Sequence, residues 1–582
     1  MPYENKKGGR IMKILRKTFI IATVCLLILI ILDCGKKYKG SPADLVIKNA
    51  KIITIDLDNP RAEAVAVKGE FIIAVTSNDE IDKYIQEGTT EVIDAKGMLV
   101  VPGLNDAHIH FMSGGRSLMD LDFRKVHDPK LIQQIVKEKV AQSKPGELIT
   151  GRGWEHETFP DKKWPTKEIL DAVAPNNPVV LSRADGHSVW VNSYVIKKSG
   201  ITKDTPNPPN GTIVRDPETG EATGIFKERA TGLLKIESSV KLSPEEQENR
   251  ADEALELALS AARKTGVTSI QHLNGEHERL QRFKDAGRLT VRVTFNMAMP
   301  DNEEDLKKLD ELRKRFPREN NWIRFGYLKS FIDGTLGSGT ALFFEPYEDD
   351  PSTSGMSMMP YEEFERRITA ADAMGFQTGT HAIGSKGNNW VLNAIEKAQQ
   401  VNGKRDSRHR SEHAQILIDS DIPRFAKLGV IASMQPTHCI TDKRFAEKRI
   451  GLERCKGAYA WQRLLQAGAQ IAFGTDWPVE PIDPLEGLYA AVTRKDRAGE
   501  PGDGWFPDQK LSMEKAIELY TLGSAYAEFM EDRKGMIKKG YLADIVIFNN
   551  DLLTIPHNEI MTSKVDHTIV GGKIVYKREE AI

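Results

Sequence analysis

The 582-residue sequence has few cysteines, almost no net charge and no internal repeat. Its four cysteines are too few to build a disulfide framework in a chain of this length, and their spacing matches no cysteine zinc site. The net charge of −2 offers no electrostatic footprint for nucleic acid. No phosphate-binding loop or dinucleotide-binding glycine motif follows an expected strand. These absences argue against a disulfide-rich domain, a nucleic-acid-binding protein and a nucleotide-dependent enzyme.

The N-terminal region contains a basic stretch and then the apolar residues 19–32, with Cys34 directly after them. A basic region followed by a short apolar region has the form of an export signal. A cysteine at its end resembles the lipidation site of a bacterial lipoprotein, although Asp33 stands where such signals carry a small residue. We therefore expect residues 1–34 to direct export to the periplasmic or cell-surface side. They would then hold the protein at a membrane, through a lipid or as an uncleaved anchor.

Short β-strand patterns near both ends of the chain point to one shared domain. Four segments combine β-branched residues with turn residues: 44–54, 64–75, 543–548 and 565–576. A chain of 582 residues is too long for one compact core, so two or three structural units are expected. The simplest arrangement pairs the two ends in a small β-sandwich domain made of residues 43–100 and 530–582.

The long middle region alternates helix and strand patterns. A helix is predicted over 243–265, with a capping sequence at Ser243 and a strand directly after it. The strand patterns of this region are 267–272, 289–295, 323–332, 377–381, 411–414, 429–435 and 470–476. Repeated strand–helix units predict an α/β fold with a parallel sheet, and about eight strands favour a (β/α)8 TIM-like barrel over residues 101–529. Residues 116–242 fit the repeat poorly, so we expect them to form an inserted subdomain over the barrel mouth.

An apolar run over residues 99–107 ends in His108 and His110. Side chains alternate along a β-strand, so these two imidazoles project from the same face. Two imidazoles at the end of a strand can bind one metal ion through their ring nitrogens. In isolation, such a pair is as often two solvated or core histidines. The pair becomes more specific if other strand ends of the barrel supply further ligands.

Four more strand ends carry residue types that bind metals: Lys329, His381, His413 and Asp476. Each has an ordinary structural explanation when taken singly. A lysine in an apolar strand can extend to solvent or pair with Asp333, a histidine can pack in the core, and an aspartate after Gly-Thr can cap a turn. The complete set is more specific than any member, because the site of a (β/α)8 barrel lies at the carboxyl ends of its strands.

These segments together resemble the amidohydrolase superfamily, and most closely amidohydrolase family 3, the branch with N-substituted formamide deformylase-like proteins. The resemblance runs from about residue 44 to residue 576. It is carried by residues 102–110, 185–192, 329–334, 381–384, 408–413 and 474–476, and by 535–546, which resemble the return into the β-domain. One departure is Ser385, where the family often has aspartate.

The resemblance implies a site for one or two divalent metals, most often zinc. The implied ligands are His108, His110, Lys329, His381, His413 and Asp476. Lys329 matches a lysine that is carboxylated on its amine to bridge two metals. Asp476 would accept a proton from a metal-activated water and deliver it to the leaving nitrogen, so no nucleophilic serine or cysteine is needed. His187 lies in a segment that resembles the substrate-side loop, and a substrate contact and a structural role are both open for it.

The leading hypothesis is therefore a metal-dependent hydrolase of a non-peptide carbon–nitrogen bond in a small N-substituted amide. Trp154 and Trp190 of the insert could line its pocket, and a partly apolar, enclosed pocket favours small amides over polypeptides; core packing is the alternative for either ring. A deaminase or a cyclic-amide hydrolase would use the same scaffold. An extracytoplasmic binding protein without catalysis is a third hypothesis, which a missing ligand would favour. The sequence leaves open whether the chain forms a homodimer.

Overall fold

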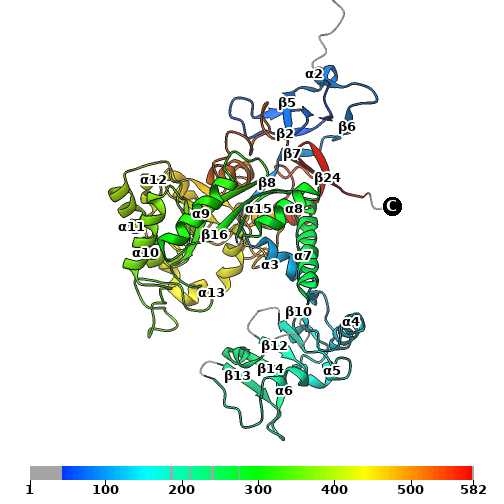
Figure 1. The fold of residues 1–582 in the computed structure, drawn as a ribbon, viewed down its shortest axis with the longest axis vertical. Helices are drawn as coiled ribbons and strands as arrows, with labels where there is room; N and C mark the ends of the chain where they lie inside the picture. The colour runs from blue at the N-terminus through cyan, green and yellow to red at the C-terminus, as the bar shows by residue number, and fades with distance from the viewer. Residues whose placement is uncertain (1–41, 184–187, 209–210, 237–241, 274, 580–582) are drawn as a thin grey trace, which may run out of the picture.

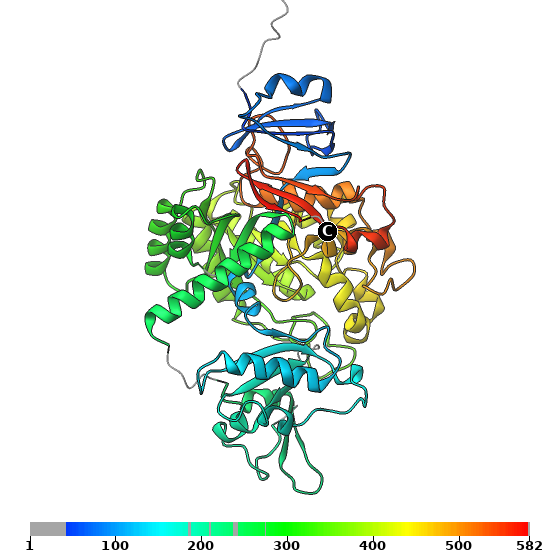
Figure 2. The same ribbon diagram turned by 90° about the vertical axis from the view of Figure 1, so that its right-hand side faces the viewer.

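The computed structural model describes residues 42–183, 188–208, 211–236, 242–273 and 275–579. Three regions follow one another along the long axis of the molecule, with a small β-region at one end, a barrel in the middle and an inserted sheet at the other end (Figures 1 and 2). The expected export segment, residues 1–34, lies outside the described residues. Among the described helices, none is both long and apolar enough to cross a membrane.

Eight parallel strands form the central sheet, and each pairs with the next in chain order. They are β8 (Leu104–Ile109), β15 (Val267–Leu273), β16 (Arg292–Ala298), β17 (Ile323–Phe331), β18 (Thr378–Ala382), β19 (Arg410–His413), β20 (Ile431–Met434) and β21 (Ile471–Phe473). Beyond the last strand, the Asp476 amide donates to the His108 carbonyl at 2.8 Å and the His110 amide to the Trp477 carbonyl at 2.9 Å. These bonds join the first strand to the last at the carboxyl ends, and the predicted α/β barrel is confirmed.

Helices alternate with the barrel strands and cover the outside of the sheet (Figure 1). They are α3 (Phe111–Ser117), α7 (Pro244–Lys264), α8 (His277–Asp285), α9 (Glu303–Arg315), α10 (Tyr361–Ala373), α11 (Ser385–Asn402), α12 (Ile422–Leu428), α13 (Pro436–Cys455), α14 (Trp461–Gln466), α15 (Pro484–Thr493), α16 (Met513–Glu518) and α17 (Ser524–Ala527). Helix α7 begins with the predicted capping box, in which Ser243 and Glu246 each bond the other's backbone amide. Its buried stripe includes Leu255 and Leu259, which are four residues apart and therefore share one face.

Two sheets lie next to the amino-terminal end of the barrel. One contains β5 (Phe71–Thr76), β4 (Ala64–Lys68), β1 (Leu45–Lys48) and β6 (Glu91–Asp94). The other contains β24 (Lys573–Lys577), β23 (Val565–Val570), β22 (Ile545–Phe548), β7 (Leu99–Pro102), β2 (Lys51–Ile53) and β3 (Arg61–Ala62). Strand β7 pairs with β2 on one side and with β22 on the other, so residues from the two ends of the chain are hydrogen-bonded in one sheet. Strand β8 follows β7 directly and enters the barrel from this side (Figure 1).

The inserted region is a separate six-stranded sheet with its own apolar core. Its strands, in spatial order, are β13 (Gly211–Arg215), β14 (Ala222–Glu228), β12 (Ser188–Val191), β11 (Val179–Arg183), β10 (Ile149–Trp154) and β9 (Leu121–Asp122). Helices α4 (Pro129–Ala141), α5 (Lys167–Asp171) and α6 (Ser193–Lys198) accompany it. Trp154 and Trp190 are fully buried in this core, edge to face with ring centroids 5.9 Å apart. Core packing, which was the safer interpretation of these two rings, is therefore confirmed, and the pocket-lining alternative is excluded.

Candidate active site

A cavity of about 960 Å³ opens at the carboxyl ends of the barrel strands. All six predicted ligands line it: His108, His110, Lys329, His381, His413 and Asp476. They come from the ends of β8, β17, β18 and β19 and from the turn after β21, so five separate segments of the barrel converge on one space. His187 lies outside the described residues. Every described residue that lines this cavity belongs to the barrel or its loops, and charged side chains make up much of the wall.

His108, His110 and Asp476 form one group whose ligand atoms all lie within 4.8 Å of one another. The Asp476 Oδ1 atom is 3.6 Å from His108 Nε2 and 3.3 Å from His110 Nε2. Asp476 reaches this position from a left-handed backbone conformation, with φ 59°. A non-glycine residue in such a conformation costs about 1–3 kcal/mol and persists only where surrounding structure imposes it. Here the bond from its amide to the His108 carbonyl imposes it.

Three of the four histidines are held through one ring nitrogen, which leaves the other ring nitrogen for the cavity. The contacts are His108 Nδ1 with Glu412 Oε2 at 2.5 Å, His381 Nε2 with the Gly334 carbonyl at 3.0 Å, and His413 Nδ1 with Gln435 Oε1 at 2.7 Å. In each contact the partner is an acceptor, so the ring donates and its second nitrogen carries a lone pair. Metal-binding histidines are held in this way by carboxylates and carbonyls. The arrangement fits a metal ion.

Electrostatics keep these imidazoles neutral. Burial lowers the pKa of His108 to about 4 and that of His381 to about 3, and it also lowers the pKa of His413 well below its usual value. A neutral imidazole is the form that binds metals. Burial also lowers the pKa of Lys329 to about 8, and its Nζ has no hydrogen-bond partner in the described structure. A buried amine with no acceptor is costly unless its chemistry or its surroundings change.

Two buried carboxylates that sequence reasoning missed position the ligands. Asp106 accepts from the amide of His108 at 3.1 Å and from the amide and hydroxyl of Thr475 at 3.0 and 2.5 Å. It therefore ties β8 to the segment that carries Asp476, and burial raises its pKa to about 7. Glu412 holds His108; burial opposes its charge, but Arg410 and His108 bring its pKa well below the usual value. Asp106 lies within the apolar run before His108, and that position was the signal in the sequence.

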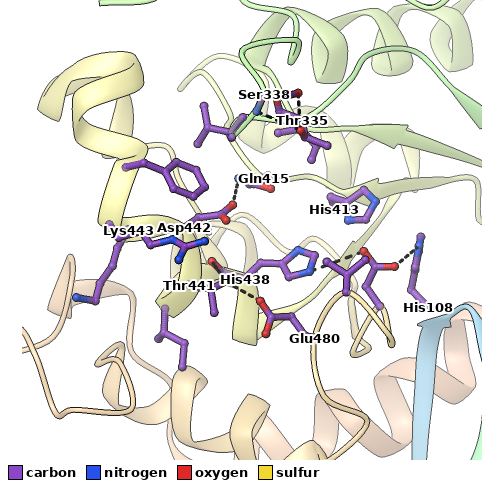
Figure 3. Close-up of a pocket in the computed structure, with 18 of the residues that line it drawn as sticks. His108, Thr335, Ser338, His413, Gln415, His438, Thr441, Asp442, Lys443 and Glu480 are labelled. Carbon is purple, nitrogen blue, oxygen red and sulfur yellow. Dashed lines mark hydrogen bonds and ion pairs between the residues drawn. The ribbon is translucent and has the colours of Figure 1, made fainter. Parts of the chain in front are cut away.

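A third missed group is His438, at the start of α13 after the seventh barrel strand. Its Nε2 atom is buried, has no hydrogen-bond partner in the described structure and lies 3.7 Å from Asp476 Oδ2 (Figure 3). His413, His438 and Asp476 form a second group of ligand atoms within 4.8 Å. Asp476 belongs to both groups, with Oδ1 toward one and Oδ2 toward the other. The predicted strand 429–435 leads directly to this residue, so its place at a strand end was the available signal.

The family model for amidohydrolases matches residues 91–576, which includes the barrel and all six predicted ligands. The chain belongs to the amidohydrolase family. The resemblance drawn from the sequence motifs is thereby confirmed, and this amidohydrolase is a hydrolase that acts on carbon–nitrogen bonds.

Relatives match this amidohydrolase over nearly their whole length. It is 33% identical over 564 residues to protein LONG AFTER FAR-RED 3 of Arabidopsis thaliana, with 92% of each chain covered. It is 27% identical over 544 residues to N-substituted formamide deformylase of Arthrobacter pascens, covering 92% of this chain and 98% of that one. A solved metal-dependent hydrolase of Pyrococcus furiosus superposes with a TM-score of 0.68 at 29% identity, covering 88% of this chain and 100% of that one.

Proposed function

We propose that this amidohydrolase hydrolyses the carbon–nitrogen bond of a small, non-peptide N-substituted amide with the help of one or two divalent metal ions, zinc first among them. The observation that carries the proposal is the cavity itself. Six residues with metal-binding side chains line it. In three of its histidines, one ring nitrogen is hydrogen-bonded to the protein, which leaves the other nitrogen for a metal ion. The deformylase of Arthrobacter pascens acts on N-substituted formamides by name, which supports the same substrate class here.

The donor set fits zinc, which binds imidazole nitrogen and carboxylate oxygen and keeps an open position in catalytic sites. His108, His110 and Asp476 would hold the first ion, and His381 and His413 would contribute to a second. A bound divalent ion lowers the pKa of water and polarises a carbonyl. Asp476 Oδ1 is buried without a hydrogen-bond partner, which supports its assignment as a ligand atom.

Lys329 fits this site only in a modified form. Its amine is buried, it lies among the histidines and it has no hydrogen-bond acceptor. An ammonium among these ligands would repel a divalent cation. A carbamate, formed when the amine combines with carbon dioxide, instead carries a negative charge and two oxygen ligands. We therefore propose that Lys329 is carboxylated when two ions are bound.

The protein's own residues would handle the proton of the reaction. Water adds to the amide carbon and the carbon–nitrogen bond breaks, so one proton must move from the water to the departing nitrogen. Asp476 can take this proton and return it, because its two oxygens face different sides of the cavity. Asp106 and Thr475 hold the turn that carries Asp476 in place throughout.

A substrate panel tests this proposal. Protein loaded with zinc is assayed against N-formyl, N-acyl and cyclic amides, and against esters, lactones and phosphoesters. We expect hydrolysis of at least one amide, with release of the free amine. Turnover of an ester or phosphoester without turnover of any amide would contradict the substrate class and leave a metal-dependent hydrolase of another bond. Release of ammonia from an aminated ring would instead favour the deaminase hypothesis.

We also propose that residues 1–34 export the protein and that Cys34 retains it at a membrane. The support is the sequence alone, in which a basic stretch and an apolar run end at that cysteine. Cells that express the wild type and Cys34→Ala are separated into soluble and membrane fractions. We expect wild type in the membrane fraction and the variant in the soluble exported fraction. Wild type in the cytoplasmic fraction would contradict export, and membrane retention of both forms would indicate an uncleaved anchor.

A further inference from the structure

The wall of the cavity beside the proposed metal ligands is built by the first two turns of α13. His438, Thr441 and Asp442 are spaced three and four residues apart, so they lie on one face of the helix, and all line the cavity (Figure 3). Glu480, in the loop after β21, joins them by accepting a 2.7 Å hydrogen bond from the Thr441 hydroxyl through Oε1. We call His438, Asp442 and Glu480 the acidic wall.

Asp442 is held in place by neutral side chains. The Gln415 amide nitrogen and the Tyr459 hydroxyl both donate to its Oδ2 atom at 2.8 Å. These neutral donors fix the carboxylate, while its Oδ1 accepts no hydrogen bond from any described residue. Asp442 forms no ion pair within the described ranges of the chain, although it lines the cavity. Burial raises its pKa, which reflects the cost of a negative charge without a partner.

Glu480 is in a similar position. Its nearest cationic group is Arg497, 3.6 Å from Oε2, and that guanidinium is bound more closely by Glu486, at 2.5 Å. Burial raises the pKa of Glu480 as well. The carboxylate is nine-tenths buried and faces the same cavity as Asp442. A cationic group placed between the two would lower the cost of both charges.

His438 stands between the carboxylates of this wall and the proposed metal ligands, and it also has an unpaired ring nitrogen. The residue is only 8% exposed, and its Nε2 atom has no hydrogen-bond partner in the described structure. Buried polar atoms in proteins are nearly always paired, so an orphaned atom that faces a cavity indicates a group that binds there. His438 lies between Asp476, 3.7 Å away, and the carboxylate one helical turn further along α13.

The basic residues of the cavity do not offer a comparable site for an anion. Lys443 is paired with Asp496 at 2.8 Å. Arg444 is exposed at the rim, where its guanidinium lies 5.5 Å from the centre of the Phe445 ring. Arg497 is held by Glu486, and Lys329 lies among the proposed metal ligands, where Glu412 and Asp476 are the acidic groups that act on it. The charge at this wall is therefore negative.

We propose that the acidic wall is a substrate subsite that binds a positively charged amino or guanidino group of the amide. This inference rests on the proposed amide hydrolysis and narrows its substrate class. Helix α13 rises about 1.5 Å per residue, so Asp442 lies about 6 Å along the helix from His438. The cationic group is therefore expected a few carbon atoms from the amide that is cleaved, within reach of both carboxylates.

Two probes of equal length test the subsite. N-(4-aminobutyl)acetamide carries a terminal ammonium, and N-pentylacetamide carries a methyl group in its place. Their binding to the zinc-loaded Asp476→Asn protein is measured by isothermal titration calorimetry, so that turnover does not interfere. We expect the cationic probe to bind about tenfold more tightly or better. Asp442→Asn and Glu480→Gln are then added one at a time. Whichever of the two has the larger effect should reduce the ratio of the two affinities to about twofold or less.

A matched control separates local contact from overall charge. Asp419→Asn removes the same charge from a carboxylate that is 86% exposed and lies outside the cavity, and it should leave the preference unchanged. Circular dichroism and thermal melting check that each variant folds. If Asp442→Asn does not fold, Glu480→Gln alone tests the subsite. Equal binding of the two probes, binding of neither, or a preference that survives both wall substitutions would overturn the subsite. Failure of wild type on the whole amide panel would overturn the proposed reaction instead, while the binding preference would remain measurable.

Discussion

The two ends of the barrel both bury charged side chains, but they satisfy them differently. At the amino-terminal end, the Glu528 carboxylate receives hydrogen bonds from Asn105 at 2.7 Å, from Arg324 at 2.6 Å and from the Thr294 hydroxyl. The ammonium of Lys534 also lies 2.6 Å from it. Every oxygen of this carboxylate is occupied by the protein itself.

At the carboxyl-terminal end, several buried polar atoms have no partner in the described structure. They are Lys329 Nζ, His438 Nε2 and Asp476 Oδ1, and all three residues line the cavity. Asn105 Oδ1 and Arg324 Nε of the amino-terminal cluster are also unpaired, but neither residue lines this cavity. Unpaired buried donors and acceptors cost about 1–3 kcal/mol each, and those that line a cavity can be satisfied by a group that binds there. The amino-terminal cluster therefore stabilises the barrel, whereas the carboxyl-terminal cluster is arranged for a metal ion and a substrate.

The largest effect is expected when the proposed metal ligands are removed. The His108→Ala/His110→Ala protein should lose bound zinc and at least about 10⁴-fold of its hydrolytic rate, the upper end of what one acid–base group contributes. Its melting temperature should change less than that of an amino-terminal variant, because these rings make few bonds to the protein. Elemental analysis of the purified protein measures the metal. An equal metal content in wild type and the double variant would show that the site is elsewhere.

Asp476→Asn sharpens the comparison, because it keeps the shape of the side chain and removes the proton acceptor. We expect turnover to fall by about 10²- to 10⁴-fold while the circular dichroism spectrum stays that of wild type. Asp496→Asn, in the same cavity but already paired with Lys443, serves as a control and should retain most of the activity. Near-wild-type turnover of a metal-loaded Asp476→Asn protein would remove this residue from the mechanism.

At the amino-terminal end, Glu528→Gln should reduce stability rather than chemistry. Removing the charge leaves Arg324 and Lys534 buried without their partner, and breaking such a pair costs about 3–5 kcal/mol of unfolding free energy. The kcat of the folded protein should stay within about twofold of wild type, because sites that share no contacts usually affect each other by only a few tenths of a kcal/mol. Urea unfolding and steady-state kinetics on the same preparations measure both.

The pH dependence of this loss has a defined sign. Burial alone would raise the pKa of Glu528, but Arg324 and Lys534 lower it to about 2. A depressed folded-state pKa stabilises the protein above the unfolded value of about 4.5, and that stability disappears as the pH falls toward 2. The difference in stability between wild type and Glu528→Gln should therefore be full at pH 6 and shrink below pH 4.5. A difference that grows on acidification would contradict this account.

Sequence reasoning found the carboxyl-terminal ligands because each stands at an expected strand end, and because the set and its order resemble a known family. It did not find Asp442, because a polar residue four positions after His438 is ordinary for a helix face and its neighbours Gln415 and Tyr459 are distant in sequence. Nor did it find the amino-terminal cluster, since Glu528 meets Asn105 from 423 residues away. The strand predicted over 289–295 begins instead at Arg292, because the apolar residues before it lead from α8 into the sheet.

The smallest effect is expected at Asp106, which belongs to the carboxyl-terminal end but resembles Glu528 in being saturated. It holds the His108 amide and Thr475 and reaches no substrate, so it acts by positioning Asp476. Substitutions that loosen the supports of a metal ligand typically cost about 10- to 100-fold in metal affinity or activity. Asp106→Asn keeps the two amide contacts through its carbonyl oxygen, so we expect the lower end of that range. Zinc affinity, measured by competition with a chelator, should fall together with kcat/KM. A loss of stability as large as that of Glu528→Gln, with zinc affinity unchanged, would contradict this role. Asp106 would then be a structural residue like Glu528, although it lies at the carboxyl-terminal end.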